Sequence, residues 1–226
     1  MSTTGPERSY GGEAASDRVA RRRAALIDAA LTAMSESRWR STTVAGLCSD
    51  AQLNKRYFYE SFADLDAVAV AAIDDLSAQV ADAAVAAYLD TLGRPLDVQA
   101  RSAVDAIIGV LGTDRRKARV LLGGAAGTPV VDSRRTDAIV GLTAVLIEHA
   151  RTIHDVRLEA DSLAQTAPPF VVGGTAQAIL AWADGSLAVT RGQLADDLTS
   201  LWLSLGASAA ETARARMDSA SVEGGD

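Results

Sequence analysis

The chain of 226 residues carries 22 Lys and Arg residues against 29 Asp and Glu residues, which gives a formal net charge of −7. Hydrophobic residues make up 48% of the sequence, which excludes a globally disordered protein. Aromatic residues make up only 4%, and the abundance of Ala, Leu and Val favours helices over a β-sandwich.

The charge is distributed unevenly along the chain. Between Arg18 and Phe62 there are eight Lys or Arg residues against four Asp or Glu residues, a balance of +4. Residues 63–226 hold 13 Lys or Arg residues against 22 Asp or Glu residues, a balance of −9. A basic segment on an acidic chain suits a local contact with a polyanion, while the acidic remainder discourages nonspecific adhesion.

The N-terminal part of the chain predicts a flexible arm and three helices. The arm is residues 1–16, which are rich in Gly, Ser and Thr. Residues 17–36 then form a helix, because apolar residues recur at helical spacing: Ala20, Ala24, Ile27, Leu31 and Met34. Thr43 is suited to cap a second helix over 44–50, and Asn54 a third that ends at Glu60. Two short helices joined by so tight a turn make a helix-turn-helix.

The rest of the chain predicts further helices and no strand pattern. A long helix starts at residue 64 and stops near Leu92, before Gly93 and Pro95. We expect the others at 97–111, 114–122, 133–155, 170–187 and 192–209, with a polar loop up to Pro169. The sequence therefore predicts an all-α fold: a helix-turn-helix domain at 17–63, a larger helical domain at 64–217, and a disordered tail at 218–226.

Several classes of protein are disfavoured. The uncharged run 162–183 is interrupted by Pro168-Pro169 and by two glycines, so it is a poor membrane span. The N-terminus lacks an apolar stretch of signal-peptide type, and we expect a cytoplasmic protein. The single Cys48 excludes an internal disulfide, and two histidines are too few for a metal cluster, so no metal and no cofactor are expected.

A basic and aromatic cluster occupies the start of the third predicted helix. A recognition helix presents its N-terminal side chains to base edges in the major groove, so Lys55, Arg56 and Tyr57 are candidate DNA contacts. Thr43 is a candidate phosphate contact, through its hydroxyl and the amides beside it. Further backbone contacts are available from the first helix: Arg18, Arg21, Arg22 and Arg23. The alternative is a basic surface that is only solvated.

The segment 42–68 resembles the DNA-binding region of the TetR family of transcriptional regulators. Family members typically read Thr-Thr-Val, an apolar–Ala pair, Ala-Gly-Val-Ser, Leu-Tyr-x-x-Phe and Ser-Lys-x-x-Leu. The corresponding places are held by Thr42-Thr43-Val44, Leu47-Cys48, Ala51-Gln52-Leu53-Asn54, Phe58-Tyr59 and Phe62. The resemblance implies a repressor that binds pseudo-palindromic operator DNA as a homodimer. It makes 17–63 the helix-turn-helix DNA-binding domain and 64–217 the helical ligand-binding and dimerisation domain. It also implies that Thr43 and Tyr59 contact phosphates, while Lys55, Arg56 and Tyr57 face bases or backbone.

This chain departs from the family pattern at three positions. Gln52 replaces the usual turn glycine, so the turn either avoids a positive φ or is modestly strained. Arg56 stands where a small residue is common, and Leu65 replaces a lysine that usually contacts a phosphate. Arg40, with Arg38, is a candidate to replace that contact.

Two of the predicted helices near the C-terminus carry apolar stripes. The resemblance assigns the last two helices to a four-helix interface, for which the candidates are Ala176, Ile179, Leu194, Leu198 and Leu201. The alternative is ordinary packing within one chain.

The family usually binds a small molecule in the helical body, and the aliphatic composition of these helices predicts a largely apolar effector. The candidate contacts are Tyr88, His149, Gln177 and Trp182. His149 follows an apolar face, and it either lines the pocket or is a satisfied core histidine. A regulator controlled by a protein partner, or by no ligand, is the alternative.

Catalysis is not expected. The adjacent pairs Asp74-Asp75 and Asp196-Asp197 point in different directions on a helix, so neither forms a facing dyad. No nucleophile elbow, zinc motif or dinucleotide fingerprint is present. The glycine-rich segment 123–129 lacks the Gly-Lys-Ser/Thr ending of a phosphate loop.

Overall fold

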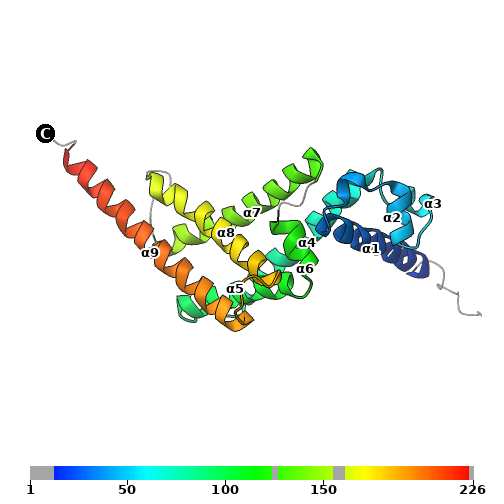
Figure 1. Ribbon diagram of the computed structural model, residues 1–226. Coiled ribbons are helices and arrows are strands. Elements are labelled where there is room, and N and C mark those ends of the chain that lie inside the picture. Colours follow the sequence, from blue (N-terminus) through cyan, green and yellow to red (C-terminus); the bar gives the residue numbers. More distant parts are fainter. Residues whose placement is uncertain (1–12, 124–126, 155–160, 224–226) are drawn as a thin grey trace, which may run out of the picture.

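The computed structural model describes residues 13–123, 127–154 and 161–223, and every regular element within these ranges is helical. Figure 1 shows an elongated molecule, with the N-terminal helices at one end and the C-terminal end of the chain at the other. The elements in chain order are α1 (Glu13–Ser35), η1 (Trp39–Ser41), α2 (Val44–Asp50), α3 (Lys55–Ser61), α4 (Leu65–Leu89), α5 (Leu96–Gly112), α6 (Arg115–Leu122), α7 (Pro129–His154), α8 (Ser162–Ala183) and α9 (Arg191–Glu223).

Helices α1, α2 and α3 and the turn η1 form a small module that we call the head. Its interior is apolar: Leu26, Leu47 and Phe58 are fully buried, and Trp39 is 3% exposed. Cys48 fills a buried place in the same core, and this burial raises the pKa of its thiol, with Lys55 acting in the opposite direction. The predicted helix-turn-helix is confirmed, and the two predicted helix starts, at Val44 and Lys55, are correct.

Helices α4 to α9 form the larger module, which we call the body. Helix α4 packs against α1 of the head and against α5 and α7 of the body, so a single unbroken helix belongs to both modules. The core continues along α4, α5 and α6 through buried aliphatic side chains such as Ile73, Ile108 and Leu121. No helix in the described ranges is long and apolar enough to cross a membrane.

Several predicted boundaries were wrong. Helix α1 begins at Glu13, inside the predicted arm, and α7 begins at Pro129 rather than at residue 133. A proline fits the first turn of a helix, where its missing amide hydrogen has no partner to lose. Residues 1–12 and 224–226, the remaining parts of the predicted arm and tail, lie outside the described residues.

The largest difference lies in α8, which starts at Ser162 and contains Pro168 and Pro169, where a loop was predicted. Asp161 caps this helix, since its Oδ1 accepts from the amides of Leu163 and Ala164 at 2.8 and 3.3 Å. Each proline removes one backbone hydrogen bond. Pro168 is buried on the inner face of α8, and this apolar burial offsets part of that cost.

The early start of α8 also explains why α9 runs to Glu223, beyond the predicted end at residue 209. The additional turns of α9 bury Ala210 and Ala213 with Ala164 of α8, and Met217 packs beside them. Arg216 Nη1 lies 3.5 Å from Asp161 Oδ2, which is the cap of α8. Each extension therefore provides the surface against which the other packs.

Candidate nucleic-acid interface

The helix-turn-helix is held by side-chain caps at both of its helices. Thr43 Oγ1 accepts from the amide of Gly46 at 3.1 Å, and Asn54 Oδ1 accepts from the amide of Tyr57 at 3.1 Å. Each cap satisfies an amide that the helix leaves without a partner. The turn between the helices places Gln52 at φ 54°, a conformation that favours glycine. Of the two predicted alternatives, the turn therefore keeps its positive φ and is strained at Gln52.

Four of the predicted DNA contacts lie on the outer surface of the head. Lys55 and Arg56 are exposed at the start of α3, and Tyr59 is 61% exposed. Thr43 is exposed as well; its oxygen accepts a capping bond, but its hydroxyl hydrogen remains available to donate. These four residues place exposed donors at the start of α2 and on α3.

Two predicted contacts have other partners. Tyr57 is half-buried, and the guanidinium of Arg22 on α1 lies 4.0 Å from the centre of its ring, so Tyr57 packs against α1. Arg40 Nε donates to the carbonyl of Gly127 at 3.1 Å, which directs this side chain towards the body. Tyr57 is therefore the least exposed of the predicted set, while Arg40 is exposed but directed towards the body.

Sequence reasoning missed Glu60, which connects two arginines of the head. Its Oε1 accepts from Arg56 Nε at 3.0 Å, and its Oε2 lies 3.4 Å from Arg22 Nη1. The Arg56–Glu60 spacing of four residues is a signal that the sequence contains, because such residues are neighbours on a helix. The partner on α1 has no comparable sequence signal.

A second basic region lies beside this network. Arg18, Arg21 and Arg22 line a hollow of about 420 Å³ whose apolar wall is made by Ala25, Leu53 and Tyr57. The arginines of α1 thus lie next to the start of α3, as a shared contact with one polyanion requires.

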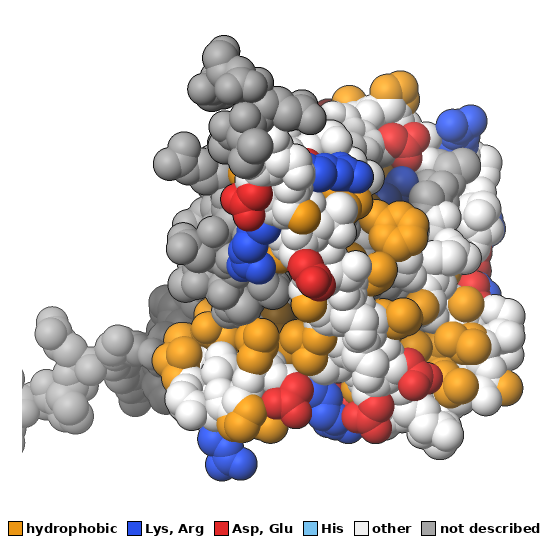
Figure 2. Space-filling model, turned by 90° about the vertical axis from the view of Figure 1, so that its left-hand side faces the viewer, with side chains coloured by type: hydrophobic (Ala, Val, Ile, Leu, Met, Phe, Trp, Pro, Cys, Tyr) orange, Lys and Arg blue, Asp and Glu red, His pale blue; other side chains and the backbone are white. Residues whose placement is uncertain are grey.

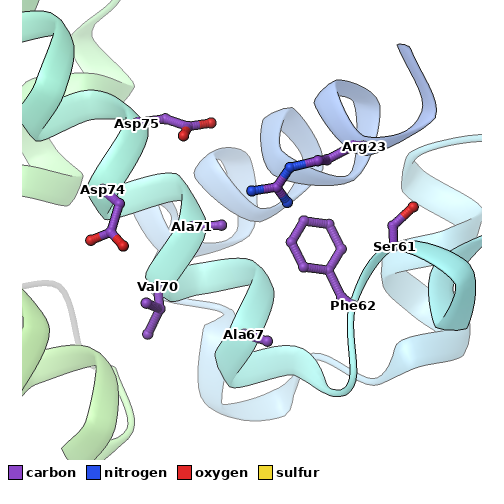
Figure 3. A pocket seen from close by; sticks show the side chains of 8 residues that line it. All are labelled: Arg23, Ser61, Phe62, Ala67, Val70, Ala71, Asp74 and Asp75. Atoms are coloured by element: carbon purple, nitrogen blue, oxygen red, sulfur yellow. The ribbon is translucent and has the colours of Figure 1, made fainter. Parts of the chain in front are cut away.

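A further hollow, of about 530 Å³, lies where the head meets α4 (Figure 3). Figure 3 shows Arg23 of α1 over the ring of Phe62, with Asp74 and Asp75 on the facing helix α4. The Arg23 guanidinium lies 4.5 Å from the centre of that ring, and Asp74 accepts from Arg134 of α7. Arg23 and Asp74 are therefore engaged within the chain, and the hollow, which Asp75 also lines, does not match the apolar effector pocket that was predicted.

No protein-family model matches the chain, and no curated protein matches it. Solved structures do match. A TetR-like transcriptional regulator from Rhodococcus sp. RHA1 aligns with a TM-score of 0.61 and 23% identity, over 80% of this chain and 93% of the other. The fatty acid degradation regulator FadR from Bacillus halodurans gives a TM-score of 0.67 and 14% identity, over 80% and 94%. FadR from Bacillus subtilis, in complex with stearoyl-CoA, aligns with a TM-score of 0.60 and 13% identity, over 79% of this chain and 96% of the other.

The chain has the TetR-type fold. The resemblance inferred from the segment 42–68 is thereby confirmed at the level of the fold, for the head and for the body.

Within this TetR-type fold, α6 links the body to the head. Arg116 Nη2 donates to Asp28 Oδ1 at 2.8 Å and Arg116 Nη1 to Thr32 Oγ1 at 2.6 Å, both on α1. The hydrogen bond from Arg116 also holds the pKa of Asp114 below its usual value. On the same helix, Arg119 Nε donates to Asp184 at the end of α8 at 2.7 Å. A short basic helix thus connects α1 to α8.

The predicted ligand contacts do not meet in one described cavity. Gln177 is exposed on α8, and Trp182 Nε1 donates to the carbonyl of Val189 at 2.9 Å. The ring of Trp182 covers Gly112 so closely that a Cβ there would lie 2.5 Å from it, so Trp182 serves to pack α8 on α5. Tyr88 is half-buried on α4, and the side chain of His149 lies outside the described residues.

Three of the five predicted interface residues are buried in the chain's own core. Ile179, Leu194 and Leu198 have exposed fractions of 1%, 2% and 4%. A side chain that is already buried has almost no surface left to bury against a second copy, so for these three residues the burial favours the alternative of ordinary packing within one chain. Ala176 is half-buried, and Leu201 is 55% exposed.

Proposed function

We propose that this protein is a TetR-type transcriptional regulator that binds operator DNA through its head. The observation that carries the proposal is a capped helix-turn-helix whose second helix presents Lys55, Arg56 and Tyr59 outwards in an otherwise acidic chain. An α-helix fits the major groove of B-DNA, and side chains at its N-terminal end reach base edges. We assign Lys55 and Arg56 to bases or backbone, and Thr43 and Tyr59 to phosphates.

Replacing Arg56 with alanine should relax the preference for one base position, because arginine recognises guanine through two hydrogen bonds. We expect a cost of about 1–3 kcal/mol at that position. The measurement is an unbiased selection of operator sequences from random duplex DNA, with wild type and Arg56→Ala in parallel. Wild-type affinity should also fall steeply with salt, as phosphate contacts release counterions. A wild-type protein that enriches no sequence would refute the proposed function, and equal preferences in both pools would remove Arg56 from base recognition.

We further propose that the active form is a homodimer joined through the outward faces of α8 and α9. The outward face of α8 carries Phe170, which is 66% exposed, together with the exposed glycines Gly173 and Gly174. The outward face of α9 carries Leu201 and Leu205, which are 55% and 38% exposed. Helix α8 holds no charged side chain, and α9 holds none from Leu198 to Ala210, although the exposed Asp197 lies one turn before Leu201. Uncharged stretches of this length are unusual for a solvated helix and favour burial against a partner.

Figure 2 supports this assignment, since hydrophobic side chains are spread over the end of the body that lies farthest from the head. An isologous contact there leaves both heads free. Two heads related by a two-fold axis suit a pseudo-palindromic operator.

We propose, finally, that a largely apolar small molecule binds the body and releases the operator. Two lines of reasoning support this: the body is built from Ala-, Val- and Leu-rich helices, and a neighbour with the same fold binds stearoyl-CoA. Arg116 joins α6 to α1, so it is the residue through which a displaced α6 would act on the head. Coupling of this kind is reciprocal between the two ligands.

Stearoyl-CoA is the probe for this coupling. Calorimetric titration should show weaker binding in the presence of operator DNA, by about 5- to 150-fold. Arg116→Ala should retain binding of stearoyl-CoA but lose most of that difference, because it removes the link between α6 and α1. Equal affinities with and without operator in the wild type would contradict the coupling. A complete lack of binding would exclude acyl-CoA and favour control by a partner protein.

A further inference from the structure

Glu60 is an acidic residue on α3, the helix to which the proposed function assigns DNA recognition. Any role of Glu60 in DNA recognition rests on that proposed function. It lies one residue after the exposed Tyr59 and is itself exposed on α3. A carboxylate there repels phosphates, so it weakens binding to any DNA sequence. Its contacts with two arginines nevertheless connect it to DNA recognition.

The two oxygens of Glu60 have different arginine partners. Arg56 donates from Nε to Oε1 at 3.0 Å, within α3. Arg22 donates from Nη1 to Oε2 at 3.4 Å, from α1. Arg22 is in turn held in place, because its Nε donates to the carbonyl of Arg18 and its guanidinium stacks on Tyr57.

Glu60 uses only one of the N–H donors of Arg56, the one at Nε. The guanidinium of arginine has five N–H donors in a fixed plane, and Glu60 occupies the single one at Nε. The two terminal amino groups stay free on a side chain that is 83% exposed. Those are the groups that can make two parallel hydrogen bonds to guanine. Glu60 thus restricts the orientation of Arg56 without blocking its recognition edge.

An exposed ion pair between residues four apart is weak alone. Here the second arginine and the stack on Tyr57 also restrain the carboxylate. A free arginine side chain has high rotamer entropy, part of which a binding event must otherwise remove. A restrained Arg56 therefore loses less entropy when it meets its base.

We propose that Glu60 is a specificity-determining residue of the head, which positions Arg56 for one base pair and disfavours DNA that lacks it. It acts through Arg56 and does not contact the base itself. On nonspecific DNA, the carboxylate contributes only its repulsion of the phosphates. On the operator, the ordered Arg56 offsets this repulsion. Specificity rises although total charge attraction falls.

The test compares Glu60→Ala and Glu60→Gln with wild type in operator selection and in titration of random-sequence duplex DNA. Glu60→Ala should bind random DNA several-fold more tightly and lose about five- to tenfold of its discrimination, at the same base position that Arg56→Ala relaxes. Glu60→Gln keeps an acceptor for Arg56 and should lie between wild type and Glu60→Ala. The double variant with Arg56→Ala should lose no further discrimination.

Asp50→Asn is the matched control, because Asp50 is an exposed acid of the same head whose carboxylate lies near Arg38 and not near Arg56. It changes the net charge equally and should leave base preferences unchanged. If Glu60→Ala keeps the wild-type preferences, or loses preference at a different position, the inference fails while the proposed function stands. If wild type itself selects no sequence, the proposed function fails first. Thermal unfolding of each variant excludes a loss of fold as the cause.

Discussion

Replacing Phe58 with alanine should destabilise the head by about 3–5 kcal/mol and abolish operator binding. Phe58 is completely buried, and its ring lies edge-on to Tyr59, with centroids 5.2 Å apart, and close to Phe62. Truncation leaves a cavity between α1, α2 and α3, so the orientation of α3, the proposed recognition helix, is lost. Domains are stable by only about 5–15 kcal/mol, so this loss is large for so small a module.

Hydrogen exchange measures the prediction directly, because amides of α2 and α3 should lose protection while those of α5 and α9 keep it. Phe58→Leu is the control: it retains most of the volume and should cost less than about 1.5 kcal/mol. Loss of protection throughout the chain would show that the head and the body do not unfold separately. Intact operator binding by Phe58→Ala would contradict the role given to the core of the head.

Replacing Leu201 with glutamate should separate the subunits without unfolding them. Leu201 is 55% exposed in the single chain, so the new carboxylate is solvated in the monomer and carries no folding penalty. In the proposed dimer the two-fold axis brings two such charges into an uncharged face. We expect a cost of about 2–4 kcal/mol, or roughly 30- to 1000-fold in the dissociation constant.

Sedimentation at several concentrations gives that constant. Val19→Glu is the matched control, since Val19 is a 46% exposed aliphatic residue on α1, at the opposite end of the molecule. It should leave dimerisation unchanged. Leu198→Glu, by contrast, places a charge in the core of one chain and should unfold it. A Leu201→Glu protein that remains dimeric at micromolar concentration would move the interface elsewhere.

What could be predicted from the sequence depended on the range of the interactions involved. The caps at Thr43 and Asn54 act over three residues, so the starts of α2 and α3 were predicted correctly. The start of α8 was not, because a proline is a local stop signal whose cost here is offset by burial against another helix. The length of α9 depends on that same contact.

The predicted dimer interface stays a prediction, and the structure divides its candidate residues by burial. Periodicity identifies the apolar positions of a helix but not which of them the rest of the chain covers: Ile179 and Leu198 pack within the chain, whereas Leu201 stays exposed. The exposed face of α8 is uncharged and partly glycine, which apolar periodicity does not detect. A search for helix faces that lack charge would have found Phe170, which the predicted set does not contain. Glu60 was missed because its role depends on Arg22, 38 residues away.

Helix α4 contains neither glycine nor proline over the 25 residues from Leu65 to Leu89. At 1.5 Å per residue it is a rod about 37 Å long, which packs on α1 of the head and on α5 and α7 of the body. A tilt of about 5° at the body end would displace the head end by roughly 3 Å, close to the axial step of about 3.4 Å between base pairs. Angular changes too small to disturb the packing of the body are thus large on the scale of a DNA register.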